Sequence, residues 1–170
     1  MFQHIPRIKS RVWQASLPLA LSLLALFFTG CEGVAGSDPE VDRMQLQQTL
    51  EAYLPKLEEA YETLDATVLE EYAVPKEVAT VHHNLQLLKG EGRHLRPVFK
   101  QVTVEDFTVW NHSNAFVSTL EIWDLRVYAL GTETLTSQAI GQRNRVKYQM
   151  KRIGDEWKVL LRQIDSTLQS

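Results

Sequence analysis

The first amphipathic segment of the chain has its apolar residues at steps of four, four, three, four and three positions. This spacing places them on one face of an α-helix. Asp38 or Ser37 can cap that helix, and Pro39 can occupy its first position, where a missing N–H does no harm. Pro55 predicts a kink or a division near Leu54. The apolar face consists of Leu46, Leu50, Leu54, Leu57, Tyr61 and Leu64.

Two further helices are expected before the pattern changes. Asp65 can cap a short helix through residues 68–72. Pro75 opens another, in which Val78, Val81, Leu85 and Leu88 again follow helical spacing. Residues 90–93, Gly-Glu-Gly-Arg, end it.

Beyond Pro97 the apolar residues alternate with polar ones, which predicts β-strands. The expected strands cover 102–110, with a bulge at 105–106, then 115–129, 136–152 and 157–164. Turn chemistry at 111–114 and 153–156 joins neighbouring strands as hairpins. Helices followed by long antiparallel strands predict an α+β fold, with the helices packed on one face of the sheet.

The N-terminus has a different organisation. A positively charged stretch precedes an apolar run of 14 residues, 15–28, which would be about 21 Å long as a helix. A hydrocarbon core of about 30 Å needs closer to 20 residues, so the run is too short for a permanent transmembrane anchor. The order of features is typical of a secretion signal.

The single cysteine, Cys31, follows this run directly and cannot form an internal disulfide. Phe28-Thr-Gly-Cys31 resembles the lipobox of bacterial lipoproteins, with Phe28 in place of the commoner Leu. The resemblance implies cleavage after Gly30 and modification of Cys31 by fatty acyl chains such as palmitate, which anchor the protein to a membrane. By the same resemblance, Glu32, which follows the modified cysteine, favours a location of the protein at the periplasmic face of the outer membrane in a host that has one. The expected division is a signal peptide at 1–30, a lipidated tether at 31–43 and one domain at 44–170.

The net charge of the chain limits the classes of partner that we expect. After residue 30 the chain carries 15 basic and 21 acidic residues, a net charge of −6. An acidic body offers no electrostatic footprint for nucleic acid, which would need a basic stripe, so no nucleic-acid partner is expected. His82 and His83 are adjacent and diverge by about 100° on a helix, so no metal site is expected from them. No nucleotide-binding or common hydrolase motif is present, and no cofactor is predicted.

The order of elements resembles the nuclear-transport-factor-2-like superfamily, in which a curved sheet wraps around helices as a cone. The residues that carry the resemblance are 61–65 at the first helix break, 115–126, 144–152 and 157–159. The same region is similar to small domains of membrane-tethered bacterial and plastid-division proteins. The superfamily includes enzymes such as ketosteroid isomerase and also non-catalytic binding domains, so the resemblance leaves both functions open.

Glu121 is the candidate functional residue in the predicted sheet. Its neighbours on the same strand face are apolar, so its carboxylate would be desolvated, as a general acid or base requires. Trp123 shares this face, and Asn144 and Tyr148 face inward on the next strand by alternation. The structural alternative is a core carboxylate that pairs with an arginine or accepts from a tyrosine hydroxyl.

Asp124 and Arg126 lie two residues apart on the other strand face, where a surface cross-strand pair is expected.

Three functions remain open from the sequence. The first is a membrane-anchored, non-catalytic domain that binds a small ligand or partner protein, with Glu121, Trp123, Asn144 and Tyr148 lining the site. The second is an isomerase or dehydratase that uses Glu121 as general base. The third is a structural partner that assembles through the helix at 44–64. The absence of a recognisable polar constellation favours binding.

Overall fold

The computed structural model describes residues 38–168. Two α-helices and a short 3₁₀ helix precede four β-strands. In chain order the elements are α1 (Pro39–Thr63), η2 (Ala66–Leu69), α2 (Pro75–Gly90), β1 (Arg93–Trp110), β2 (Asn114–Ala129), β3 (Leu135–Ile153) and β4 (Glu156–Leu168).

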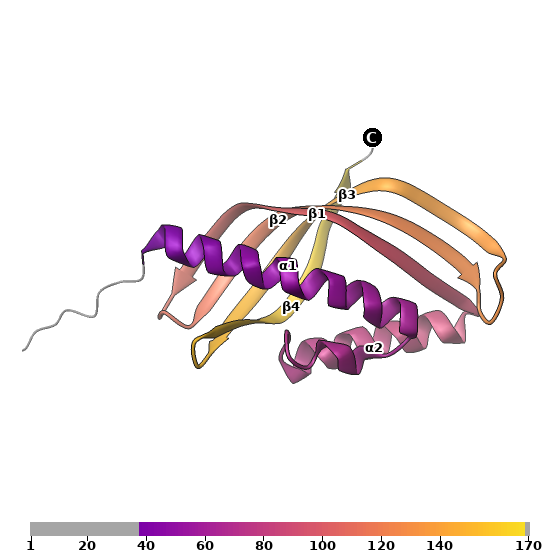
Figure 1. Cartoon of the computed structure of the whole chain (residues 1–170), viewed down its shortest axis with the longest axis horizontal. Helices are drawn as coiled ribbons and strands as arrows, with labels where there is room; N and C mark the ends of the chain where they lie inside the picture. Colours follow the sequence, from indigo (N-terminus) through magenta and orange to yellow (C-terminus); the bar gives the residue numbers. More distant parts are fainter. Residues whose placement is uncertain (1–37, 169–170) are drawn as a thin grey trace, which may run out of the picture. The chain divides into compact units, whose positions relative to one another are not determined.

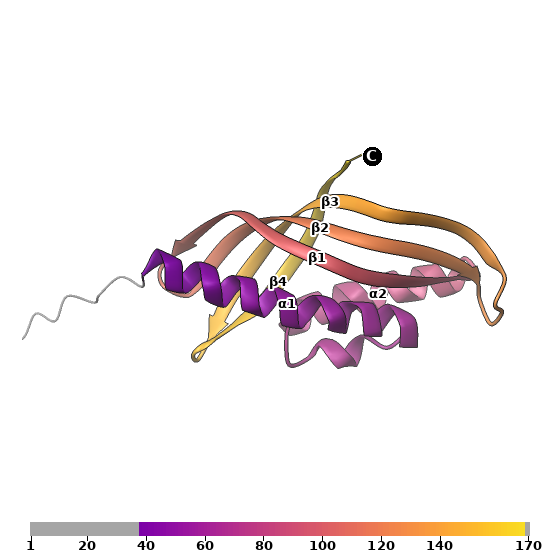
Figure 2. The ribbon, with the colours of Figure 1, turned by 45° about the horizontal axis from the view of Figure 1, so that its top comes forward.

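The four strands form one antiparallel sheet in the order β1-β2-β3-β4, in which each strand pairs with the next one in sequence. The sheet arches over the helices, which all lie on the same side of it (Figures 1 and 2). The predicted α+β fold, with N-terminal helices on one face of a curved antiparallel sheet, is therefore confirmed.

Helix α1 has the buried face that the spacing predicts. Leu46, Leu50 and Leu54 are fully buried, and the side chain of Asp38 accepts a hydrogen bond from the Glu40 N–H at 2.9 Å as the N-cap. The expected division near Leu54 is wrong, because one helix runs through Pro55. Pro55 is exposed, so the carbonyl that loses its N–H partner lies on the solvent side, where water can bind it.

Helix α1 begins at Pro39, ahead of residue 44, where the sequence analysis places the start of the domain. Residues 39–43 form the first part of α1, and Asp42 within them is buried and pairs with Arg152 at 3.1 Å. The cap at Asp38 and the proline after it fix this early start. The expected signal peptide, Cys31 and the rest of the expected tether lie outside the described residues.

Strand β1 is longer than the alternation predicts, because it begins at Arg93 and runs through Pro97. β1 is an edge strand, and an edge strand tolerates a proline, which cannot donate to a neighbouring strand. The expected bulge is present, since the pairing register with β2 shifts between Val104 and Asp106. The hairpin turns before Asn114 and Glu156 also lie where turn chemistry predicts them.

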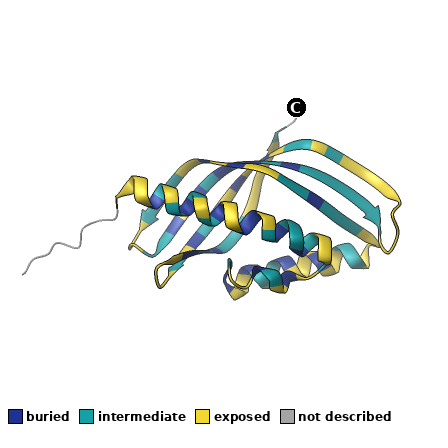
Figure 3. Ribbon diagram, viewed as in Figure 1, coloured by how far each residue is buried: buried dark blue, intermediate teal, exposed yellow. Residues whose placement is uncertain are grey.

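The core lies between the helices and the inward face of the sheet. In Figure 3 the buried positions follow one side of α1 and alternate along the strands. On β2 the buried residues are every second one from Ala115 to Trp123, and on β3 every second one from Asn144 to Met150. The predicted inward face of both strands is confirmed.

Side chains of α1 occupy the hydrogen-bonding edge of β1. The amide of Gln47 donates to the Val102 carbonyl at 3.3 Å and accepts from the Val104 N–H at 3.2 Å. Arg43 donates to the Val104 carbonyl at 3.2 Å, and Glu58 accepts from the Phe99 N–H at 2.7 Å. Helix side chains thus satisfy backbone groups that a further strand would otherwise bind.

Two features are absent from residues 38–168. None of the helices in this range combines the length and the apolar character needed to cross a bilayer. No three histidine, cysteine or acidic side chains among residues 38–168 converge as metal ligands.

The edge contacts of Gln47 lead to a first prediction. Gln47→Ala removes both hydrogen bonds to β1 and leaves a half-buried carbonyl and N–H without protein partners, so we expect a loss of about 1–3 kcal/mol in the free energy of unfolding. Gln48→Ala is the matched control, because Gln48 is exposed on the same helix and makes none of the described hydrogen bonds. Urea unfolding measures both. Equal stability of the two variants contradicts a role for Gln47 at this edge.

Candidate functional site

Glu121 lies fully buried on the inward face of β2, and three donors hold its carboxylate. Trp123 donates its indole N–H to Oε2 at 2.8 Å, and the hydroxyl of Tyr148 donates to Oε1. Arg162 donates from Nη2 to Oε2 at 2.6 Å. Both features of the structural alternative, a paired arginine and a tyrosine hydroxyl, are therefore present at Glu121.

Arg162 of β4 connects this carboxylate to its surroundings. Its Nε donates to the Tyr148 hydroxyl at 3.1 Å, and 16% of its side chain is exposed. Burial alone would lower the pKa of Arg162, but Tyr148 and Glu121 outweigh that effect and raise it. Arg162 therefore stays charged, and Glu121 has a permanent counter-ion.

Sequence reasoning missed Arg162 because of a bulge in β4. Simple alternation from the buried Trp157 and Val159 would point Leu161 inward and Arg162 outward. The register with β3 shifts between Gln149 and Met150, so that Arg162 pairs with Tyr148 and faces the core. No residue type in this stretch marks the position of the extra residue.

A second buried carboxylate, Glu77 of α2, extends the network. It accepts from the Tyr53 hydroxyl at 3.0 Å and from the backbone N–H of Arg162 at 3.2 Å. The rings of Tyr53 and Tyr148 meet edge to face, with centroids 6.4 Å apart. Burial raises the pKa of Glu77, while its hydrogen bonds to Tyr53 and Arg162 oppose the rise. The i, i+4 spacing of Glu77 with the buried Val81 and Leu85 could have indicated its burial.

Asn144 lies opposite Glu121 in the β2–β3 register but does not share its hydrogen bonds. Its Oδ1 accepts from Gln142 at 3.1 Å and from Thr167 at 3.0 Å. All four candidate residues thus occupy the inward face, while only Trp123 and Tyr148 contact the Glu121 carboxylate.

A recess of about 120 Å³ lies in front of this network. Arg162 and Asn144 contribute polar groups, and Trp123, whose ring packs on Phe99 at 5.2 Å, forms part of the apolar wall. We call it the mouth recess. Its lining residues are Leu57, Tyr61, Leu95, Pro97, Trp123, Leu125, Gln142, Asn144, Arg162 and Ile164.

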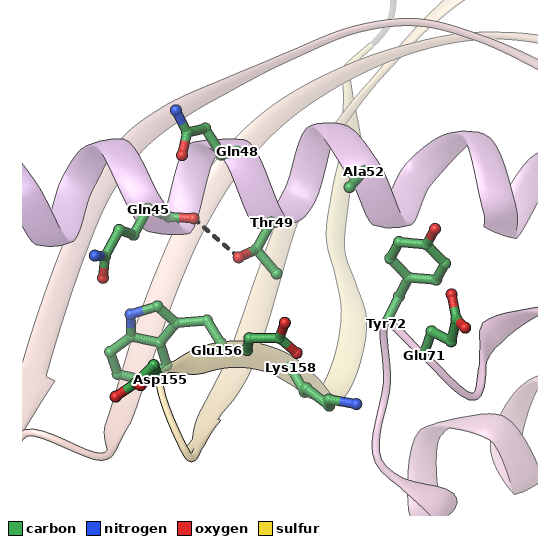
Figure 4. A pocket seen from close by; sticks show the side chains of 10 residues that line it. Gln45, Gln48, Thr49, Ala52, Glu71, Tyr72, Asp155, Glu156 and Lys158 are labelled. Carbon is green, nitrogen blue, oxygen red and sulfur yellow. Dashed lines mark hydrogen bonds between the residues drawn. The ribbon is translucent and has the colours of Figure 1, made fainter.

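A separate groove of about 610 Å³ lies between α1 and the β3–β4 hairpin (Figure 4). Its walls combine polar residues of α1, such as Gln45, with three carboxylates and one lysine. The carboxylates belong to Glu71, Asp155 and Glu156, and the lysine is Lys158. The groove contains none of the candidate residues.

The remaining sequence candidates do not join the site. Asp124 accepts from the Gly141 N–H at 2.8 Å and pairs with Lys100 of β1 at 3.2 Å, so its ionic partner is not Arg126. This is a cross-strand pair with the neighbouring strand. His82 and His83 are both exposed on α2.

The comparisons with known proteins found similarity in fold and none in sequence. No protein-family model matches the chain, and no curated protein matches it in sequence. The intermembrane-space region of the chloroplast protein ARC6 is similar in structure, with a TM-score of 0.54, 13% identity and coverage of 69% of this chain and 95% of that one. At this identity the likeness concerns the fold alone.

Two solved structures described as NTF2-like also match, at lower scores. One is from Shewanella oneidensis, with 14% identity, a TM-score of 0.43 and coverage of 69% and 96% of the two chains. The other is from Novosphingobium aromaticivorans, with 15% identity, a TM-score of 0.43 and coverage of 74% and 81%. Residues 38–168 have the architecture that the sequence predicts, with helices packed on one face of a curved antiparallel sheet.

The raised pKa of Glu77 leads to a pH prediction. The folded protein binds a proton on this carboxyl at higher pH than the unfolded chain does, so its contribution to the free energy of unfolding rises as the pH falls through the raised pKa. The rise ends below the ordinary glutamate pKa of about 4.3. Wild type should therefore gain stability relative to Glu77→Gln between about pH 7 and about pH 4.

Urea unfolding of both proteins at the two pH values measures this difference. Carboxylates away from the network titrate equally in both proteins and cancel in the comparison. A difference that is constant with pH, or that grows in favour of the variant in acid, contradicts the assignment.

Proposed function

We propose that this chain is a bacterial lipoprotein, anchored to a membrane of the cell envelope by acyl chains on Cys31, whose NTF2-like domain binds a partner and catalyses no reaction. In a host with an outer membrane, the domain would lie on its periplasmic face. The observation that carries the non-catalytic part is the state of Glu121, whose carboxylate already binds three donors in the core.

A general base needs a free position that a substrate proton can reach. Glu121 is fully buried, and Arg162 donates to its Oε2 at 2.6 Å. Its hydrogen bonds to Trp123 and Tyr148 use further acceptor positions. This arrangement supports a structural ion pair and argues against an isomerase or dehydratase that would use Glu121.

The volume of the mouth recess indicates what kind of partner could bind there. Pockets for small molecules usually measure about 300–1,000 Å³, whereas the mouth recess measures about 120 Å³. One side chain of a partner protein fits this volume better than a whole small-molecule substrate does. The apolar wall beside Trp123 and the polar groups of Arg162 and Asn144 would suit a side chain with an apolar stem and a polar end.

Glu121→Gln tests whether Glu121 is structural. The variant keeps the shape of the side chain but leaves Arg162 without its counter-ion, so we expect a loss of about 3–5 kcal/mol in the free energy of unfolding at pH 7. Glu105→Gln is the control, because it breaks an exposed pair with Arg145 and should cost at most about 1 kcal/mol. Thermal or urea unfolding measures both. A gain in stability for Glu121→Gln would favour the enzyme instead.

Cys31→Ser tests the anchor. Without the thiol no acyl chain can be attached, so the protein should leave the membrane fraction or remain uncleaved, and its mass should lack the lipid. Wild type and Cys31→Ser are compared by fractionation of bacterial cells and by mass spectrometry of the intact protein. An unchanged mass together with unchanged fractionation would show that Cys31 carries no lipid.

A further inference from the structure

We propose that the outer face of the sheet, opposite the helices, rests on the anionic phospholipid surface of the membrane that holds the chain. This inference depends on the proposed anchor at Cys31 and adds the orientation of the domain. The surface in question is called the basic sheet face. It comprises Arg143, Arg145, Lys147 and Lys151 of β3, and the aromatic pair Trp110 and Phe116.

The helical layer and the sheet carry net charges of opposite sign. Residues 38–91, which form the helical layer, carry 12 acidic and 4 basic side chains, a net charge of −8. Residues 92–168, which form the sheet, carry 8 acidic and 11 basic side chains, a net charge of +3. Since the helices cover one face of the sheet (Figure 2), an anionic surface would attract the other face and repel the helices.

The basic residues of β3 alternate with its core residues. Arg143, Arg145, Lys147 and Lys151 are exposed, whereas Asn144 and Val146, which alternate with the first three, are buried. Only two of these four make ion pairs, Arg145 with Glu105 at 3.3 Å and Lys147 with Asp165 at 2.8 Å, counting pairs within residues 38–168. Exposed pairs of this kind contribute little to folding. Because the other two basic residues have no partner among these pairs, the strand keeps a surplus of positive charge.

Lys151 lies directly opposite Lys158 of β4, which lines the groove beside α1 and is not counted in the basic sheet face. Like charges in this position destabilise a sheet. Neither lysine has a carboxylate within ion-pair distance in the described part of the chain. An anionic surface would relieve this repulsion, because its phosphate groups attract the Lys151 ammonium group.

Two aromatic side chains lie on the same face. Trp110 and Phe116 stack with ring centroids 4.7 Å apart, and they are 36% and 51% exposed. Phe116 lies opposite Gln149, between the levels of Lys147 and Lys151 on β3. An aromatic pair beside lysines suits the boundary between headgroups and acyl chains, where tryptophan is enriched.

The position of the anchor agrees with this orientation. Asp42, in the first turns of α1, contacts Arg152, whose backbone N–H donates to Ser113 in the β1–β2 turn at 2.7 Å. The start of α1 therefore lies at the end of the sheet that carries Trp110 and Lys151. Seven residues lead from Cys31 to Asp38 and span at most about 25 Å, so a lipid on Cys31 would keep this end at the bilayer.

The test uses a protein that begins at Gly36, since residues 36–170 form one compact unit with its own core. We expect it to sediment with vesicles of phosphatidylcholine mixed with phosphatidylglycerol, and not with vesicles of phosphatidylcholine alone. About 1 M salt should abolish the binding. Trp110 is the exposed tryptophan of this protein, because Trp123 and Trp157 are buried, so its emission should shift to the blue on binding.

Arg143→Gln with Lys151→Gln should weaken binding to the anionic vesicles about thirtyfold, since each basic side chain near a membrane surface is worth about a factor of five. Lys56→Gln with Lys76→Gln removes the same charge from the helical side and should leave binding unchanged. Trp110→Phe should keep most of the binding and lose the fluorescence shift.

The proposal is overturned by no binding, by equal binding to neutral and anionic vesicles, or by equal weakening in the two double variants. Because the protein that begins at Gly36 lacks Cys31, none of these outcomes depends on lipidation. The anchor is tested separately by Cys31→Ser in cells, so either idea can fail while the other stands.

Discussion

The ion pair between Glu121 and Arg162 is the contact on which the arrangement of the described domain depends. A buried charge without a partner is among the most costly features in a protein interior. Glu121 belongs to β2 and Arg162 to β4, while Tyr148 of β3 bonds to both, so three strands must keep their register for the charges to meet. A shift of one residue in β3 or β4 would separate them.

The same network links the sheet to the helices. Glu77 of α2 binds the backbone of Arg162, and Tyr53 of α1 binds Glu77. Each of these polar groups is buried or half-buried, and each finds its partner on a different element. Hydrophobic contacts supply most of the stability of such a core, but the polar network allows only one relative position of α1, α2 and β4.

The sequence predicted the elements well and the centre of the site only in part. Helical spacing identified the buried face of α1, and alternation placed Glu121, Trp123, Asn144 and Tyr148 on the inward face, because both patterns depend on local geometry. Arg162 could not be found in this way, since one extra residue in β4 reverses its direction. The course of α1 through Pro55 was also not predictable, because it depends on which side of the helix faces water.

The contacts between α1 and β1 also affect how the domain behaves among copies of itself. An open strand edge can bind the edge of another molecule and start aggregation. Gln47, Arg43 and Glu58 occupy the edge of β1, and Tyr72, Val74 and Glu77 bind the edge of β4 as far as Arg162. These contacts shorten the free part of both sheet edges, so copies held side by side on one surface would have less exposed backbone through which to join into fibres.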